Sequence, residues 1–327
     1  MSSLHAETKT AVDRALFKSA LAKAATMPRL HSLLISYDGQ LVVEEYFNGQ
    51  NPNRRANVKS VSKTIMSALI GIAIDQGHIA GLQQPVAEYY AELIDDEAKR
   101  GITVGHLLSM SAGLETTSFY NYGAWVLSPD WVAFQLRQPL LAAPGSRMIY
   151  STGYTHLLSA ILTEATGQST YRFARDALAR PLGFELAEWP RDPQGIYFGG
   201  NNMELTPRQM LEFGELYLNG GRADERQVIP ADWVETSLTP VVRSRRDSAR
   251  QYGYGWWTRK MAGVDTAFAW GYGGQFILLA PDLDLVIVTT SSSIPGDTRR
   301  RHIRGLYDLL EDDIIAPAAH AVAHAFN

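Results

Sequence analysis

The chain has 327 residues, of which 46% are hydrophobic and 20% charged, and its formal net charge is -4. This composition is typical of a globular protein, and the negative charge provides no basic field for a nucleic-acid partner. The chain contains no cysteine, which excludes disulfides, a thiol nucleophile and cysteine-based metal sites.

No apolar run is long enough to predict a membrane span. Charged residues such as Lys9, Asp13 and Lys18 also interrupt the first 30 residues, so no signal peptide is predicted there. We therefore expect a cytoplasmic protein, or a mature form whose export signal has been removed, with no membrane partner. The sequence leaves the oligomeric state unknown.

The chain begins with a helical pattern over residues 7–26. Two β-rich runs follow, 33–37 and 41–46, and the Asp38-Gly39 pair between them predicts a hairpin. A largely apolar helix is expected from Ser60 to Gln76, with Gly77 as its stop.

The middle of the chain, from about 85 to 190, reads as helix and loop. Helices are predicted over 104–110, 130–137, 155–166 and 206–219. Strands then follow over 252–257, 268–270, 276–280 and 285–290, before a last helix over 300–311.

This order predicts an α+β fold, in which an antiparallel sheet built from both termini is flanked by helices and carries a mostly helical inserted domain. We expect a sheet domain from 1–84 and 195–327, a helical domain from 85–194, and an active site between them.

Ser60 and Lys63 lie three residues apart at the start of a predicted helix. This spacing puts both side chains on one face, so the amine can reach the hydroxyl. A lysine buried under Ile65, Met66 and Leu69 would have its ammonium form disfavoured and could act as a base for the serine. Alternatively, Ser60 is only a helix cap and Lys63 a solvated residue.

Tyr150 lies just ahead of another predicted helix and behind the Pro144-Gly145-Ser146 turn. A phenol at this place can project into a cleft and pass a proton between a nucleophile and a leaving group. The alternative is a core tyrosine, with Ser151 or Thr152 as the helix cap.

Three glycines in four residues, 271–274, precede the strand 276–280. They would let the backbone approach a ligand closely, so the Tyr272 amide could complete an oxyanion hole with the Ser60 amide. The alternative is a bulged edge strand or a hairpin corner.

Seven segments together resemble the serine β-lactamase and penicillin-binding-protein superfamily, in its class C-like branch with esterases and 6-aminohexanoate-dimer hydrolases. They are Ser60–Lys63 with the following 67–74, then 102–114, Pro144-Gly145 before Tyr150-Ser151, 177–183, 252–257, Gly271–Gln275 and 281–285. The resemblance implies that Ser60 is acylated, that Lys63 is its base and Tyr150 its proton relay, and that the Ser60 and Tyr272 amides bind the oxyanion. It implies no cofactor and no metal.

The chain departs from the β-lactamases of this branch at two positions. Thr152 stands where they have an asparagine that holds an acylamide side chain. Ala269-Trp270-Gly271 stands where they have Lys-Thr-Gly, so the cation that meets a substrate carboxylate is missing.

We therefore expect Thr152, Trp270 and Gly271 to contact a neutral acyl substrate. Tyr120 and Asp130 are further substrate-binding candidates by region alone. An apolar wall is expected from Trp270, Tyr272, Trp256 and Trp125.

The predicted function is that of a serine hydrolase, acting through an acyl-enzyme on ester or amide bonds of small neutral substrates. The alternatives are β-lactamase or D-alanyl-D-alanine peptidase activity, and a non-catalytic ligand-binding protein of the same fold.

An α/β-hydrolase site is not expected, because no Gly-x-Ser-x-Gly pentapeptide occurs. His106 and His156 read as satisfied packing or surface residues. His320 and His324 share a helix face, but they lack the acidic partner of a metal motif.

Overall fold

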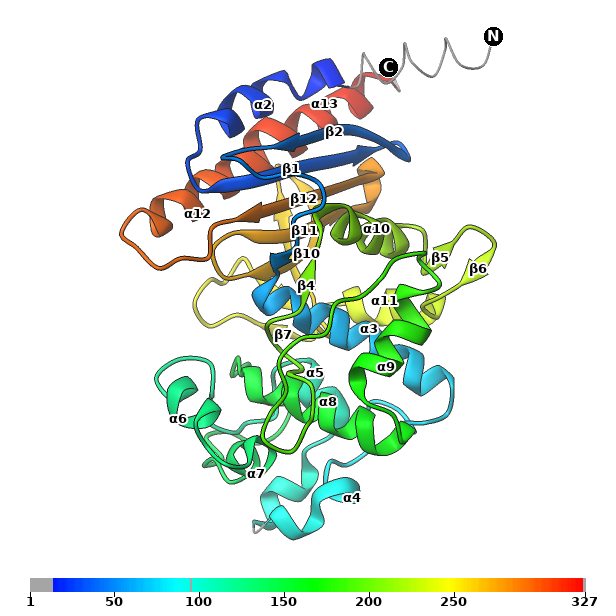
Figure 1. The fold of residues 1–327 in the computed structure, drawn as a ribbon, viewed down its shortest axis with the longest axis vertical. Coiled ribbons are helices and arrows are strands. Elements are labelled where there is room, and N and C mark those ends of the chain that lie inside the picture. Colours follow the sequence, from blue (N-terminus) through cyan, green and yellow to red (C-terminus); the bar gives the residue numbers. More distant parts are fainter. Residues whose placement is uncertain (1–13, 95, 326–327) are drawn as a thin grey trace. The chain divides into compact units, whose positions relative to one another are not determined.

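The computed structural model describes residues 14–94 and 96–325, which form two compact units. Unit 1 comprises the residues up to 58, 205–218 and those from 259 onward. Unit 2 comprises 59–204 and 219–258. Figure 1 shows the strands and the helices of both units. The fold class is α+β, as predicted.

The sheet of unit 1 is built from both ends of the chain. Its strands lie in the order β2-β1-β12-β11-β10-β9. Strand β1 is antiparallel to both β2 and β12, so that Leu34 pairs with Glu44 on one side and with Val288 on the other. The strands are β1 (Leu30–Tyr37), β2 (Gln40–Tyr46), β9 (Trp257–Met261), β10 (Val264–Gly271), β11 (Gln275–Ala280) and β12 (Leu285–Ser291).

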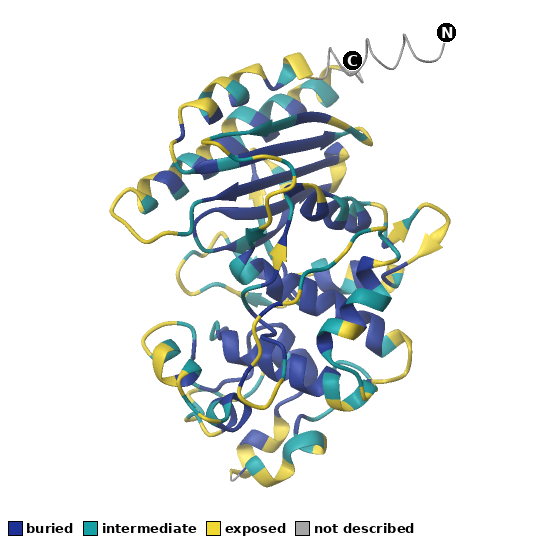
Figure 2. Cartoon of the chain, in the orientation of Figure 1, coloured by how far each residue is buried: buried dark blue, intermediate teal, exposed yellow. Residues whose placement is uncertain are grey.

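Helices cover both faces of this sheet. On one face lies α10 (Pro207–Leu218), where a Cβ on Gly214 would come within 2.5 Å of Val286. On the other face Tyr307 of α12 (Arg299–Asp308) packs against Phe276, with ring centroids 5.4 Å apart. The same unit contains α2 (Lys18–Ala25), a π-helical segment (Leu309–Ile315) and α13 (Ala316–Ala325). Because both faces are covered, β11 and β12 are buried along their whole length (Figure 2).

Unit 2 is organised around helix α3 (Ser62–Asp75), which is buried from Ser62 to Ala73 and packs against α8 (Thr152–Thr166). Only glycine fits at position 71, because a Cβ there would lie 2.3 Å from the Trp233 ring. The remaining α-helices are α4 (Ala87–Tyr90), α5 (Val104–Leu108), α6 (Tyr122–Val126), α7 (Trp131–Leu136), α9 (Thr170–Ala174) and α11 (Ala231–Leu238), and a π-helical segment (Arg175–Ala179) follows α9.

Short strands complete the secondary structure. They are β3 (Ala56–Asn57), β4 (Glu204–Leu205), β5 (Arg222–Ala223), β6 (Arg226–Gln227), β7 (Val242–Arg243) and β8 (Gln251–Tyr252).

Most predicted elements are confirmed within a few residues, but the strand predicted over 252–257 is wrong. Strand β8 ends at Tyr252 and β9 begins at Trp257, with a turn between them in which Gly255 has φ +91°. A Cβ on Gly255 would also lie 2.6 Å from the Ser67 side chain, so the alternating aromatic pattern here marks a turn held against α3. Residues 7–13 of the first predicted helix lie outside the described residues.

The contacts divide the chain differently from the expected domain boundaries. Residues 59–84, 195–204 and 219–258 group with the helical unit, because α3 packs against α8 and α11 packs against α3. Ser60, Lys63 and Tyr150 consequently all belong to unit 2.

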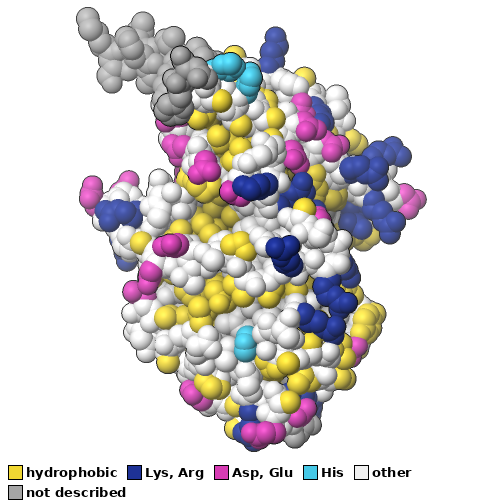
Figure 3. Space-filling view, turned by 180° about the vertical axis from the view of Figure 1, so that it is seen from behind, with side chains coloured by type: hydrophobic (Ala, Val, Ile, Leu, Met, Phe, Trp, Pro, Cys, Tyr) yellow, Lys and Arg dark blue, Asp and Glu magenta, His cyan; other side chains and the backbone are white. Residues whose placement is uncertain are grey.

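Among residues 14–94 and 96–325, no helix combines the length and apolar character needed to cross a bilayer. Figure 3 shows acidic and basic side chains on the same face, with the Lys and Arg atoms in separate clusters.

Candidate active site

The turn before α3 places Ser60 and Lys63 together. A 3-10 turn, Lys59–Val61, leads into the helix, and Lys59 has a left-handed φ of 54°. The first turn of a helix leaves backbone N–H groups without intrahelical partners, and the Ser60 amide lies at that end. Ser60 is half-buried, whereas the Lys63 side chain points inward and is only 2% exposed.

The Lys63 amine has two polar neighbours. Its Nζ lies 3.0 Å from Ser60 Oγ and 2.6 Å from the carbonyl oxygen of Gly200. Burial lowers the pKa of Lys63 from 10.5 to about 7, because removal from water disfavours the ammonium form. A substantial neutral fraction is therefore present near neutral pH, and a neutral amine can accept the Ser60 proton.

Tyr150 completes the group. Its hydroxyl hydrogen-bonds the Ser60 side chain, and Lys63 Nζ lies 5.2 Å from its ring centroid. Burial raises the pKa of Tyr150 to about 12, although the Ser60 hydrogen bond acts in the opposite direction. The phenol is therefore protonated at neutral pH. Its ring stacks on Trp257, with centroids 5.8 Å apart and an interplanar angle of 21°.

A network of hydroxyl groups fixes the backbone around Tyr150. The Thr116 hydroxyl donates to the Tyr150 carbonyl at 2.6 Å. Ser151 donates to the Gln135 side chain at 2.8 Å and accepts from the Thr117 amide at 3.0 Å. The segment 115–118 thus holds the residue that precedes α8, and Ser151 serves this network instead of capping the helix.

The loop that carries Gly200 is tied to α3 and α8. Met203 N–H donates to Ser62 Oγ at 3.2 Å, beside the Gly200–Lys63 contact. Gly199 and Gly200 both press on α8: a Cβ at Gly199 would lie 2.1 Å from the Thr155 carbonyl oxygen, and one at Gly200 would lie 3.0 Å from Thr152. Close approach to the helix requires glycine at position 199 and leaves little room for a side chain at position 200.

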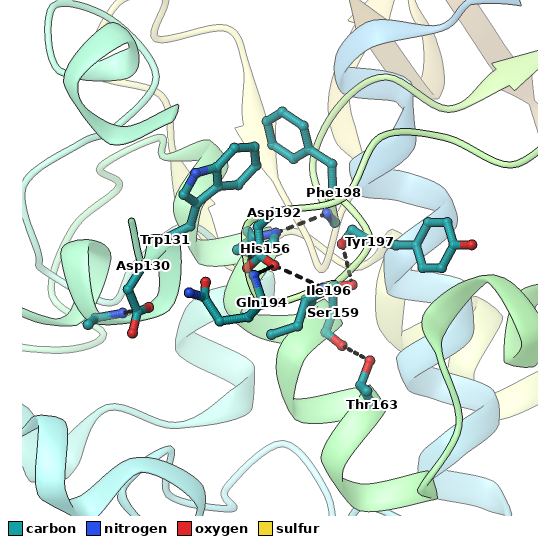
Figure 4. A network of polar contacts seen from close by, with 12 residues as sticks. Asp130, Trp131, His156, Ser159, Thr163, Asp192, Gln194, Ile196, Tyr197 and Phe198 are labelled. Atoms are coloured by element: carbon teal, nitrogen blue, oxygen red, sulfur yellow. Dashed lines mark hydrogen bonds and ion pairs between the residues drawn. The ribbon is translucent and has the colours of Figure 1, made fainter. Parts of the chain in front are cut away.

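A buried histidine–aspartate pair supports the loop that carries Gly200 (Figure 4). His156 Nε2 lies 2.9 Å from Asp192 Oδ2, and neither side chain is exposed. The other oxygen of Asp192 accepts the amides of Gln194 and Ile196 at 2.9 Å, and His156 Nδ1 accepts Gly199 N–H at 3.5 Å. The pair therefore links α8 to the loop residue that precedes Gly200.

Three predicted substrate-binding residues lie in unit 2. Thr152 is 5% exposed and its hydroxyl bonds Ser118 Oγ at 2.7 Å. Tyr120 is exposed and donates to Glu115. Asp130 caps α7 by accepting the Ala133 amide at 2.8 Å. Their substrate-binding roles stay predictions.

Three others lie in unit 1, where the end of β10 leads into the glycine turn. Gly271 lies against the backbone of Val58, since a Cβ on it would come within 2.2 Å of the Val58 carbonyl oxygen. Tyr272 is half-buried, with the Arg299 guanidinium 4.6 Å from its ring centroid, and Trp270 is half-buried. The oxyanion role of the Tyr272 amide and the substrate roles of Trp270 and Gly271 stay predictions.

The expected apolar wall is wrong at two of its four members. Trp125 and Trp256 have no exposed surface. Trp125 packs against Trp131 and Phe198 in a core cluster, with centroids 5.0 and 5.4 Å apart, and so it cannot line an open site. Trp256 lies inside the turn between β8 and β9.

The reading of the histidines as satisfied residues is confirmed for His106 and His156. His106 forms a capping box with Thr103 at the start of α5, and His156 pairs with Asp192. His320 and His324 do share a face of α13, with Nε2 atoms 2.9 Å apart. Within the described residues no cluster of three or more His, Cys, Asp or Glu could hold a metal ion.

The sequence interpretation missed the partners that hold the site. These partners are the Gly199–Gly200 pair, the Asp192–His156 contact and Ser118. The two glycines were the available signal, because adjacent glycines often mark a close backbone approach.

Comparisons with known proteins identify the family of this chain. The Beta-lactamase family model matches residues 29–310. A 6-aminohexanoate-dimer hydrolase from Paenarthrobacter ureafaciens is 26% identical over 302 residues, which cover 83% of this chain and 74% of the relative.

Two solved structures share the fold. EstCE1, a hydrolase with promiscuous acyltransferase activity, has a TM-score of 0.73 at 17% identity, covering 92% of this chain and all of EstCE1. An octameric penicillin-binding protein homologue from Pyrococcus abyssi has a TM-score of 0.68 at 17% identity, covering 88% of this chain and 75% of the homologue. Because the family model spans most of its length, this chain belongs to the Beta-lactamase family.

Proposed function

We propose that this chain is a serine hydrolase, in which Ser60 attacks the carbonyl carbon of an ester or amide and becomes acylated. The observation that carries the proposal is the 3.0 Å contact between Ser60 Oγ and the Lys63 amine, whose pKa is lowered to about 7. A hydroxyl needs such a neighbour to lose its proton during attack.

The steps follow from the protonation states. Neutral Lys63 takes the Ser60 proton as Oγ bonds to the substrate carbon, and the carbonyl oxygen gains the negative charge. The amides of Ser60 and Tyr272 are proposed to bind that oxygen. Tyr150, protonated at neutral pH, gives its proton to the leaving oxygen or nitrogen as the carbon–leaving-group bond breaks, and regains one from Lys63. Water then hydrolyses the acyl-enzyme.

The proposed substrates are small neutral acyl compounds instead of β-lactams or D-alanyl-D-alanine peptides. Thr152 has no side-chain amide that could hold an acylamide group, and its hydroxyl is already bonded to Ser118 Oγ. The segment Ala269-Trp270-Gly271 provides no cation for a substrate carboxylate. The curated relative is named as a hydrolase of the 6-aminohexanoate dimer, which makes amides a second substrate class to test.

The test compares p-nitrophenyl butyrate with nitrocefin, using the wild-type chain, Ser60→Ala and a control, Ser146→Ala, at an exposed serine. We expect ester turnover well above nitrocefin turnover, and its loss only in Ser60→Ala. Turnover that survives Ser60→Ala would remove the nucleophile assignment, and the opposite substrate ranking would favour a β-lactamase.

An independent measurement is mass spectrometry after reaction with a fluorophosphonate. We expect one adduct on the peptide that contains Ser60. Labelling of Ser62 or Ser151 would overturn the assigned roles, and a folded chain that neither reacts nor turns over any ester or linear amide would indicate a ligand-binding protein.

A further inference from the structure

Unit 1 contains a cavity of about 180 Å³, whose lining residues include none of those assigned to the proposed acylation chemistry. It lies where the start of β1 and the end of β12 meet the loop that follows β2. Its walls contain no carboxylate. The lining residues are His31, Ser32, Tyr46, Gln50, Asn51, Arg54, Arg55, Ala56, Asn57, Pro207 and 290–294.

Positive charge converges on this cavity without a counter-charge. In the described part of the chain, neither Arg54 nor Arg55 forms an ion pair. The pKa of the half-buried His31 is lowered, first by burial and then by the positive charges of Arg54 and Arg29. The Arg54 and Arg29 charges are therefore felt at His31. The carboxylate of Glu44, which accepts a hydrogen bond from Tyr46, already accepts hydrogen bonds from Nε and Nη2 of Arg208 at 2.6 and 2.8 Å.

Arg29 fixes the backbone of one cavity wall. Its Nη2 donates to the carbonyl of Ser292 at 3.0 Å and also to that of Ile294, which fixes the segment that forms one wall. Its Nε is buried and has no hydrogen-bond partner among the described residues. Arg29 does not line the cavity itself, so it acts by fixing this wall and by adding positive charge behind it.

Hydroxyl groups line the same wall. The run Ser291-Ser292-Ser293 continues from β12, and Thr290 and Ser32 bond to each other at 2.6 Å. Ser291 is held by His302 at 2.9 Å. Hydroxyl and guanidinium groups from several chain segments suit a tetrahedral oxyanion, which accepts hydrogen bonds on three or four oxygens.

We propose that this cavity binds a phosphate group, either as inorganic phosphate or as the phosphate of a small monoester. Its volume equals that of about six water molecules at ~30 Å³ each, which is ample for the group. The two unpaired guanidiniums supply the counter-charge, because a guanidinium fork matches a phosphate edge in geometry. A planar carboxylate would use fewer of the available donors.

The experiment measures inorganic phosphate binding to the full chain by isothermal titration calorimetry, at ionic strength held constant with NaCl. Phenyl phosphate and acetate are titrated in parallel. We expect saturable phosphate binding that the double variant Arg54→Gln/Arg55→Gln weakens at least about tenfold. A matched control, Arg222→Gln, removes an exposed charge from a different hairpin and should leave binding unchanged.

Both side chains are exposed, so the double variant is expected to fold, which far-UV circular dichroism and the melting temperature will check. Binding of phosphate and phenyl phosphate alike identifies the phosphate group as ligand, and binding of only one identifies its source. Absence of saturable phosphate binding, acetate binding of equal affinity, or equal weakening in Arg222→Gln would each overturn the proposal.

Discussion

The Nζ of Lys63 lies 2.6 Å from the carbonyl oxygen of Gly200, a shorter contact than its 3.0 Å distance to Ser60 Oγ. This backbone acceptor takes one N–H of the neutral amine and leaves the other N–H and the lone pair for Ser60. The position of a loop carbonyl is therefore a determinant of the proposed chemistry.

Replacing Gly199 with alanine tests that dependence. The added Cβ would lie 2.1 Å from the Thr155 carbonyl oxygen, so the loop must move and carry the Gly200 carbonyl away from Lys63. We expect kcat for p-nitrophenyl butyrate to fall by about 10²-fold, as misplaced catalytic groups commonly produce. Gly101→Ala is the control, because its Cβ would meet nothing within 4 Å. An unchanged kcat in folded Gly199→Ala would contradict the role of the loop.

The Asp192–His156 pair should control the same loop through the imidazole tautomer. In Asp192→Asn the new amide can donate a hydrogen bond to Nε2, so the tautomer protonated at Nδ1 is favoured. The Nδ1 proton then faces the Gly199 N–H, and the hydrogen bond between them is lost. We expect kcat to fall at least about tenfold with KM changed less than about threefold, since binding groups are untouched. His156→Gln can donate to Asp192 and accept from Gly199, and should keep most of the activity. Equal activity in wild type and Asp192→Asn would show that the pair serves packing alone.

The pKa of Lys63 sets the expected pH dependence. Because burial lowers this pKa to about 7, the neutral amine accumulates as pH rises, and kcat/KM should rise through a midpoint near pH 7 before levelling off. A profile that is flat from pH 5 to 9 would exclude Lys63 as the base.

The same burial predicts a change in stability for Lys63→Met. Between about pH 7 and 10.5 the unfolded wild-type chain binds the lysine proton and the folded chain does not, so its free energy of unfolding rises with pH in this range. Below pH 7 both states bind the proton, so the full cost of burying the charged ammonium lowers the free energy of unfolding. The inactive variant should therefore be more stable than wild type at pH 6, by up to about 5 kcal/mol, and the gain should shrink toward pH 10.5. Urea unfolding at both pH values measures this, and a variant less stable than wild type at pH 6 would contradict it.

The variant Tyr150→Phe removes the hydroxyl and keeps the ring, so it distinguishes the contribution of the one from that of the other. The phenylalanine can keep the stacking on Trp257, while proton transfer to the leaving group is lost. We expect kcat to fall by about 10²–10⁴-fold with little change in melting temperature. Stopped-flow measurement of p-nitroaniline release from butyryl-p-nitroanilide tests acylation directly, because this nitrogen must be protonated to leave, and wild-type acylation in this variant would remove the proposed relay.

The sequence allowed Ser60 and Lys63 to be predicted because one helical turn fixes their separation. The same reasoning placed Tyr150 next to a helix. It could not supply the Gly200 carbonyl, since a backbone acceptor carries no residue-type signal and lies 137 residues from Lys63. Asp192 and His156 meet only because the loop after position 190 returns to α8.

Residue type alone also does not predict whether a side chain lies in the core or lines a cavity. Trp125 and Trp256 were expected beside a substrate because indole rings often line apolar sites, yet both are fully buried. The strand error at 252–257 has a related cause. Alternating aromatic residues fit an extended strand, but Gly255 requires a positive φ that ends it.

The pairing of β1 with β12 has a consequence for synthesis on the ribosome. Ser32 and Thr290, which bond across these strands, are 258 residues apart. The amino-terminal hairpin must therefore emerge with an open edge and remain without its partner until nearly the whole chain has been translated, whereas every segment of unit 2 is complete by residue 258. An open hydrophobic edge can pair with other chains, so nascent copies should depend on chaperones far more than the finished molecule does.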